Sequence, residues 1–135
     1  NKITILVVED EVDFRTIMTF WLESKGYAVI TASDGRAGVE MVKEKNPDVV
    51  FLDLNMFGMD GVEAFKNIRK FNQDIPVIII SAHIGTPRAK EVMSLGVSGI
   101  FPNVLVMNME EEDFEKGFAL LEIALKGNKK LKGRI

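Results

Sequence analysis

The sequence predicts an α/β fold, a doubly wound sheet of five parallel strands with helices on both faces. Short apolar runs, each long enough for one buried strand, recur along the chain. They alternate with segments that have the apolar period or the capping residues of helices, and no internal repeat interrupts the pattern. Alternating strands and helices imply a parallel sheet with right-handed crossovers, which leaves few topologies.

The composition is that of one globular domain. Of 135 residues, 47% are hydrophobic and 27% are charged, which suffices for a real core. The absence of cysteine excludes disulfide bonds and thiolate metal sites. A formal net charge of −3 argues against direct nucleic-acid binding by this domain. No apolar run approaches the roughly 20 residues that span a bilayer, and no signal peptide is visible, so we expect a cytoplasmic protein.

Five apolar runs supply the predicted strands. They are residues 3–8, 28–32, 49–52, 77–80 and 99–103. The third and fourth are uninterrupted, which is typical of strands buried on both faces. The fifth contains Pro102, which lacks the amide hydrogen that a strand ladder uses, so we expect this strand at an edge of the sheet.

Five further segments are predicted helices. The first has apolar residues spaced i, i+3, i+4, i+7 and i+8 from Phe14 to Leu22, and Gly26 ends it. The other four begin at the capping residues Asp34, Asp60, Thr86 and Asn108 and end near Lys45, Phe71, Gly96 and Gly127. We therefore expect one domain over residues 1–126. Residues 127–135 carry four basic residues and little apolar content, which is typical of a tail or linker.

Polar residues directly follow three of the predicted strands. Glu9 and Asp10 follow the first strand, Asp53 the third and Ser81 the fourth. The carboxyl ends of parallel strands share one edge of a doubly wound sheet, where such proteins place their chemistry. If the first and third strands are neighbours, three carboxylates converge there, and their repulsion raises at least one pKa unless a cation compensates.

A magnesium ion is the natural compensation. Oxygen ligands suit Mg²⁺ better than Zn²⁺, because the chain has no cysteine and its only histidine lies elsewhere in the sequence. Mg²⁺ beside a carboxylate is a setting for phosphoryl transfer onto that carboxylate. Each residue alone has a simpler interpretation: Glu9 and Asp10 as a solvated loop, Asp53 as a helix cap, Ser81 as a small strand end. Their joint placement after buried strands favours a site.

These strand ends resemble those of a known family, the receiver domain of bacterial two-component response regulators. The shared motifs are Glu9-Asp10, the stretch 53–61 (Asp-Leu-Asn-Met-Phe-Gly-Met-Asp-Gly) and Ser81-Ala82. The resemblance covers residues 3 to about 126. It implies a flavodoxin-like sheet with the strand order 2-1-3-4-5 and a phosphoprotein that takes part in phosphorelay signalling.

The resemblance also implies roles for individual residues. Asp53 accepts a phosphoryl group from a histidine kinase or phosphotransfer protein, and Ser81 is the switch hydroxyl that moves toward that group. The implied ligands of Mg²⁺ are Glu9, Asp10, Asp53 and the backbone carbonyl of Asn55. Asn55 and His83 stand at two positions that modulate the lifetime of the phosphoryl group, and a plain surface-loop role for His83 is an equal alternative.

The sequence departs from the family after the fifth strand. The usual Lys-Pro pair is replaced by Asn103 and Val104, and no lysine lies between Lys90 and Lys116. Asn103 can donate only a neutral hydrogen bond to a phosphoryl oxygen, about half as strong as one from lysine. Ile100 stands at the aromatic switch position and has neither a ring nor a hydroxyl. These departures place in doubt the transmission of the signal rather than the acceptor site.

Three classes of function follow. The first is a receiver that signals through the face of the fourth helix, fifth strand and last helix to an effector domain, a downstream protein or a second copy. The second is a divergent pseudo-receiver, an interaction module independent of phosphorylation, which Asn103 and Ile100 motivate. The third is an enzyme such as a phosphatase with an aspartyl intermediate. Asn55 argues against it, because such enzymes carry a second acid there; flavin binding is disfavoured by the acidic loops.

Overall fold

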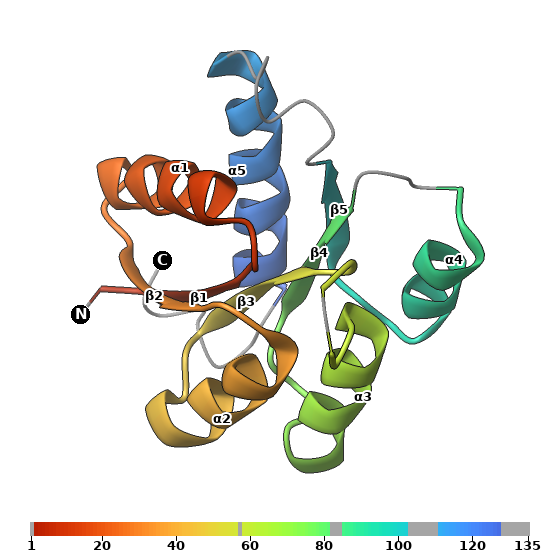
Figure 1. The fold of residues 1–135 in the computed structure, drawn as a ribbon. Helices are drawn as coiled ribbons and strands as arrows, with labels where there is room; N and C mark the ends of the chain where they lie inside the picture. The colour runs from red at the N-terminus through yellow and green to blue at the C-terminus, as the bar shows by residue number, and fades with distance from the viewer. Residues whose placement is uncertain (1, 57, 82–84, 103–110, 128–135) are drawn as a thin grey trace.

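The computed structural model describes residues 2–56, 58–81, 85–102 and 111–127, and it has the predicted alternation of strands and helices (Figure 1). The strands are β1 (Thr4–Val8), β2 (Ala28–Ala32), β3 (Val49–Asp53), β4 (Val77–Ser81) and β5 (Gly99–Pro102). The helices are α1 (Val12–Ser24), α2 (Gly35–Lys45), α3 (Gly61–Phe71), α4 (Pro87–Ser94) and α5 (Glu111–Lys126). No helix within these ranges combines the length and the apolar character that crossing a membrane requires.

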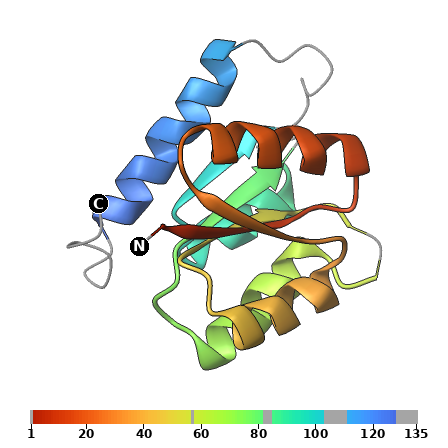
Figure 2. The same ribbon diagram turned by 90° about the vertical axis from the view of Figure 1, so that its left-hand side faces the viewer.

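The strands form one parallel sheet in the order β2-β1-β3-β4-β5, which confirms the predicted order. β5 lies at an edge, as Pro102 indicates. Helices α1 and α5 pack on one face of the sheet, and α2, α3 and α4 pack on the other (Figures 1 and 2). The three inner strands are therefore covered from both sides, and every residue of β3 and β4 is buried.

Two hydrophobic cores lie on opposite faces of the sheet. One side chain from each helix illustrates them: Met18 of α1 and Leu121 of α5 pack on one face, and Val42 of α2, Ile68 of α3 and Val92 of α4 on the other. Successive strand residues point alternately into these two cores, because side chains in a strand alternate between faces. This two-sided burial explains why the inner strands read as continuous apolar runs in the sequence.

Side-chain caps begin the helices at the predicted positions. Asp34, Asp60 and Thr86 each accept a hydrogen bond from the backbone N–H three residues later, at 2.8, 2.9 and 3.2 Å. The fourth predicted cap, Asn108, lies outside the described residues. Helix α1 begins after Glu11, whose carboxylate accepts the N–H of Asp13; the sequence pattern did not indicate this start, because glutamate is not a usual N-cap.

Candidate functional site

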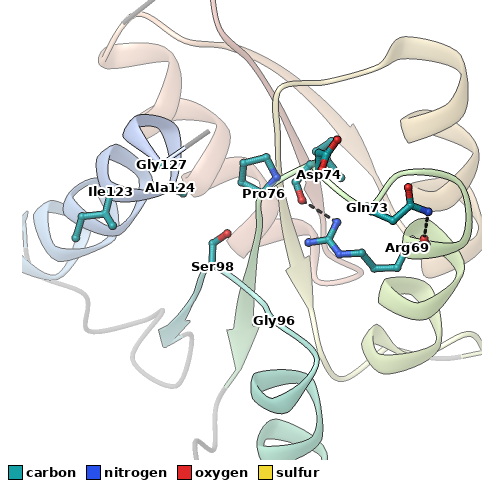
Figure 3. A pocket seen from close by; sticks show the side chains of 10 residues that line it. Arg69, Gln73, Asp74, Pro76, Gly96, Ser98, Ile123, Ala124 and Gly127 are labelled. Atoms are coloured by element: carbon teal, nitrogen blue, oxygen red, sulfur yellow. Dashed lines mark hydrogen bonds between the residues drawn. The ribbon is translucent and has the colours of Figure 1, made fainter. Parts of the chain in front are cut away.

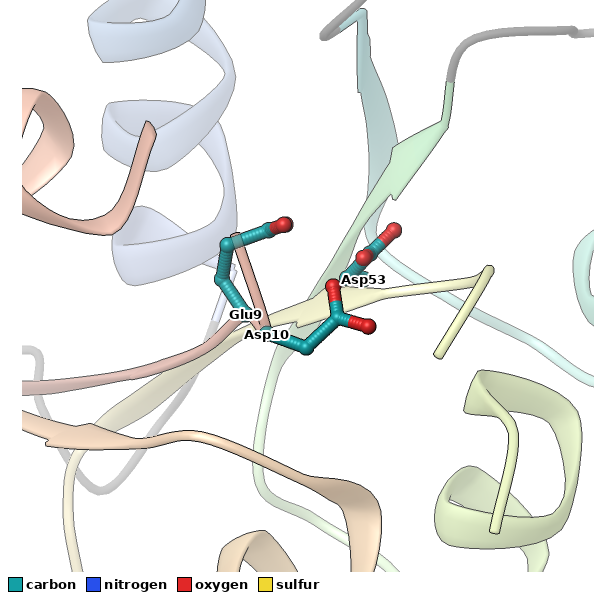
Figure 4. Close-up of side chains that lie close together, drawn as sticks. All are labelled: Glu9, Asp10 and Asp53. Atoms are coloured by element: carbon teal, nitrogen blue, oxygen red, sulfur yellow. The ribbon is translucent and has the colours of Figure 1, made fainter. Parts of the chain in front are cut away.

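The register of the sheet brings three carboxylates together. β1 and β3 are neighbours, and Val8 pairs with Leu52, so the residues that follow these two positions lie at the same edge. Glu9 and Asp10 come directly after β1, and Asp53 is the last residue of β3. One oxygen atom of each carboxylate lies within 4.8 Å of the others (Figure 4). The predicted convergence of these acids is therefore confirmed.

Two of the three carboxylates are buried. Glu9 is 1% exposed and Asp53 is 2% exposed, whereas Asp10 is partly open to solvent. Glu9 Oε1 accepts the backbone N–H of Glu11 at 3.1 Å, and the Glu9 carbonyl accepts a hydrogen bond from Arg15 at 2.7 Å. These contacts hold Glu9 with its side chain turned toward the sheet edge rather than out into water.

Burial makes the carboxyl groups of Glu9 and Asp53 weaker acids than they are in water. Burial raises the pKa of Glu9 to about 9, and the negative charge of Asp53 adds to this rise. Burial likewise raises the pKa of Asp53, to about 6. The backbone N–H of Asn55 donates to Asp53 Oδ1 at 3.1 Å, and this hydrogen bond opposes the rise because it stabilises the ionised form. The sequence predicted that at least one of these carboxyl groups has a raised pKa, with repulsion between the carboxylates as the cause. In the structure the larger cause is the loss of hydration, because the strand ends are covered on both faces of the sheet.

The donor set fits a hard divalent cation. Glu9 Oε2 is buried and has no hydrogen-bond partner among the described residues, which is costly for a carboxylate oxygen unless a cation meets it. Carboxylate oxygens are the ligands that Mg²⁺ prefers in proteins. Glu9, Asp10 and Asp53 are therefore the residues that would hold such an ion, and the contribution of the Asn55 carbonyl stays a prediction.

Two further predicted site residues, Ser81 and Asn55, lie at the same edge, whereas Ile100 lies inside β5. Ser81 ends β4, next to β3, and is 1% exposed. Asn55 is exposed in the loop after β3. Ile100 of β5 pairs with Ile79 and packs half-buried against the core formed with α2, α3 and α4.

Two predicted residues are not tested by the structure. His83 and Asn103 lie outside the described residues, so their roles as modulator of phosphoryl lifetime and occupant of the usual lysine position stay predictions.

Gly61 lets the loop after β3 fold back on its own strand. A methyl group at this position would collide with the backbone carbonyl of Asp53 and lie 2.6 Å from the Leu54 Cα. The Gly61 N–H also donates to the Leu54 carbonyl at 3.0 Å. The loop therefore closes against the residue that follows Asp53, and only glycine leaves room for this approach.

Arg88, in the first turn of α4, is the functional candidate that sequence reasoning missed. Its guanidinium donates to the Leu54 carbonyl at 2.8 Å and to Asn55 Oδ1 at 3.3 Å, and it pairs with Asp60 at 3.0 Å. No motif contains it. The signal that could have found it is topological, because a basic residue at the start of the helix after β4 must lie near the carboxyl edge of the sheet.

Cavities at opposite edges of the sheet differ in their lining. The smaller, about 250 Å³, lies at the carboxyl edge and is lined by Asp10, Asn55, Met56 and Arg88. The larger, about 410 Å³, lies near the amino ends of β4 and β5 (Figure 3). There Arg69 donates to the carbonyls of Asn72 and Ile75 at 3.2 and 2.8 Å, so its guanidinium stabilises the turn from α3 to β4. Asp10 of the acidic cluster lines the smaller cavity, which is therefore the candidate site.

Comparisons with known proteins agree with this geometry. The response regulator receiver domain family matches residues 5–109 of the chain. The transcriptional regulatory protein ZraR of Escherichia coli O157:H7 is 34% identical over 119 residues, which are 88% of this chain and 27% of that protein. A protein-glutamate methylesterase/protein-glutamine glutaminase of Natronomonas pharaonis is 40% identical over 104 residues, 75% of this chain and 29% of that protein.

The solved structures show the same fold. The chemotaxis response regulator CheY4 of Vibrio cholerae aligns with a TM-score of 0.77 and 25% identity over 88% of this chain and 98% of that one. The curated relatives are much longer than this chain, which spans 27% and 29% of the two described above. The family match extends over well more than half of the sequence and includes the strand ends that carry the acids. The chain therefore belongs to the receiver domains of two-component response regulators.

Proposed function

We propose that Asp53 accepts a phosphoryl group, in a reaction that depends on Mg²⁺, from a phosphohistidine of a histidine kinase or phosphotransfer protein. The observation that carries this proposal is the convergence of Glu9, Asp10 and Asp53 at the carboxyl edge of the sheet, with one Glu9 oxygen buried and unpartnered among the described residues. Burying carboxylates together costs stability, and a bound cation would offset that cost.

The transfer is a displacement at phosphorus. A carboxylate oxygen of Asp53 forms a bond to phosphorus while the bond from phosphorus to the donor imidazole nitrogen breaks, and that nitrogen leaves with the electron pair. A bound Mg²⁺ would supply neutralising charge to the phosphoryl oxygens. Ser81, at the end of the neighbouring strand, donates a hydrogen bond from its hydroxyl to one of these oxygens. Asp53 must be ionised to attack, and its raised pKa in the metal-free protein means that a bound cation would favour the reactive, ionised form.

Signalling proceeds through the face formed by α4, β5 and α5. Met93 of α4 is 55% exposed, Leu95 at the C-cap of α4 is 41% exposed, and Ile123 of α5 is 67% exposed, which supports a partner surface on this side of the molecule. The partner is an effector domain in the same chain, a downstream protein or a second copy. We further propose a cytoplasmic receiver over residues 1–126, residues 127–135 as linker or tail, and no catalytic turnover beyond gain and loss of its own phosphoryl group.

The second candidate is a pseudo-receiver that binds its partner without phosphorylation. Ile100 favours it, because this aliphatic side chain is half-buried in a core and offers no group that could respond to a phosphoryl group on Asp53. An affinity for the partner that is unchanged in Asp53→Asn would support this candidate, whereas an affinity that disappears would exclude it.

Intact mass after incubation with acetyl phosphate tests the first candidate. We expect the wild-type chain to gain one phosphoryl group with Mg²⁺ and none with a chelator present, and Asp53→Asn to gain none. Asp74→Asn is the matched control, since Asp74 lies in the turn from α3 to β4, at the opposite edge of the sheet. No mass gain in the wild type, or equal gain in Asp53→Asn, would refute the proposal.

A further inference from the structure

The Arg88 side chain, from the first turn of α4, contacts the loop between Asp53 and α3, which is called the acceptor loop below. Together with Asp10, Asn55 and Met56 it lines the cavity of about 250 Å³ that borders the acidic cluster. Its three partners, Leu54, Asn55 and Asp60, all lie in the loop that starts one residue after Asp53. The guanidinium is therefore held at this cavity, beside the loop that follows Asp53.

The negative charge of the three carboxylates and of a phosphoryl donor favours a second cation at the site, in addition to a bound divalent metal ion. Three ionised carboxylates exceed the charge of one divalent cation, and a phosphoryl donor is itself an anion, so the two repel at close range. Of the four residues that line the cavity, Arg88 is the basic one. Arg15 also lies near this edge, but its guanidinium donates to the Glu9 backbone carbonyl and does not line the cavity.

The contacts of Arg88 leave it able to exchange partners. Its side chain is 42% exposed, and the contact to Asn55 is long, at 3.3 Å. A half-exposed ion pair such as Arg88–Asp60 stabilises a protein little, so giving it up costs little. A guanidinium also carries five N–H donors in a planar fork that matches the oxygens of a phosphoryl group.

We propose that the Arg88 guanidinium contacts the non-bridging oxygens of the phosphoryl donor and then those of the phosphoryl group on Asp53; this rests on the proposed phosphorylation of Asp53. It donates hydrogen bonds while the bond from phosphorus to the leaving atom breaks and the bond from phosphorus to the Asp53 oxygen forms. The leaving atom keeps the electron pair of the broken bond. Arg88 acts through its positive charge and its N–H donors and takes no part in proton transfer.

The test compares four variants in two assays with Mg²⁺ present. The assays are the initial rate of phosphorylation by acetyl phosphate and the affinity for beryllofluoride, an anion with the shape of a phosphoryl group. Arg88→Ala is expected to lower both about tenfold or more, and Arg88→Lys less, since it keeps the charge and loses the fork. Lys90→Ala, an exposed charge on the same helix, is the matched control and is expected to change neither.

Asp60→Asn separates direct contact from tethering of the loop. Asparagine still caps α3, and the substitution breaks only the ion pair with Arg88. If Arg88 contacts the phosphoryl oxygens directly, Asp60→Asn is expected to be phosphorylated at an unchanged or faster rate. Added guanidinium, at concentrations that leave the fold intact, is then expected to restore part of the rate of Arg88→Ala. Equal losses in Asp60→Asn and Arg88→Ala would show a tether only.

The two proposals fail in different ways. If the wild type gains a phosphoryl group and Arg88→Ala gains it at the same rate, the role of Arg88 is refuted and phosphorylation of Asp53 stands. If the wild type gains none, both are refuted.

Discussion

Glu9 and Asp53 lie side by side at the ends of two neighbouring strands, and each is surrounded so completely that its carboxyl group holds a proton more tightly than in water. In the protein without metal, one proton on Glu9 relieves the repulsion between them. A bound metal ion would therefore compete with the proton for the same oxygen atoms, and this competition would have measurable consequences for stability.

Without metal, the free energy of unfolding is expected to fall as the pH rises from about 5 to about 9. The Glu9 pKa is raised from 4.5 to about 9, so in this range the folded state binds a proton that the unfolded state has lost. The contribution of Glu9 to this slope approaches about 1.4 kcal/mol per pH unit at most. Urea denaturation at a series of pH values measures it. Glu9→Gln is expected to flatten the slope, and a wild-type stability that rises with pH would contradict the assignment.

Mg²⁺ is expected to stabilise the wild type, and more at pH 8 than at pH 6, because binding must displace the proton on Glu9. At a free concentration one hundred times Kd, the gain is about 2.7 kcal/mol. Thermal unfolding with and without a chelator measures it. Asp10→Asn is the variant of choice, since Asp10 is partly exposed and its loss leaves the cores intact. An equal gain in Asp10→Asn would place the ion elsewhere.

Ser81→Ala is expected to slow phosphorylation of Asp53 by about tenfold, because one donor to the phosphoryl oxygens disappears. Ser81→Thr keeps the hydroxyl and is expected to keep most of the rate. Both substitutions are at a position that is 1% exposed, so the unfolding midpoint of each variant must be measured beside its rate. A full rate in Ser81→Ala would remove the hydroxyl from the mechanism.

Gly61→Ala is expected to destabilise the fold by about 1–3 kcal/mol, since the new methyl group collides with the Asp53 carbonyl and the loop must move. It is also expected to slow phosphorylation, because the same movement displaces Asp53. Gly85→Ala is the control: a methyl group there meets no atom within 4 Å. Chemical denaturation of both variants decides the matter, and equal stabilities would exclude the close approach as the cause.

Much of the fold followed from the sequence because buried strands and capped helices have local signals. Asp34, Asp60 and Thr86 cap the helices as predicted, and Asp53 lies at the carboxyl end of its strand, one residue beyond the predicted apolar run. The start of α1 after Glu11 was not predicted, because no usual capping residue marks it.

The site was predictable only where it lies directly after a strand. Glu9, Asp10 and Asp53 met this condition, and their convergence followed from the strand order. Arg88 did not, because its contacts with the acceptor loop depend on the reach of a long side chain across the gap between α4 and that loop. The dominance of burial over repulsion in the pKa of Glu9 also needed the tertiary structure, since it depends on coverage from both faces.

The position of β1 and β3 in the middle of the sheet limits how this site can change. Both strands are packed by helices on each face, so a shift of either acid by even a fraction of an ångström would repack two independent cores. The two buried acids thus tolerate little displacement. Substitutions that change the partner or the lifetime of a phosphoryl group are therefore expected on the helices and loops around the carboxyl edge, where a substitution disturbs a single layer of packing.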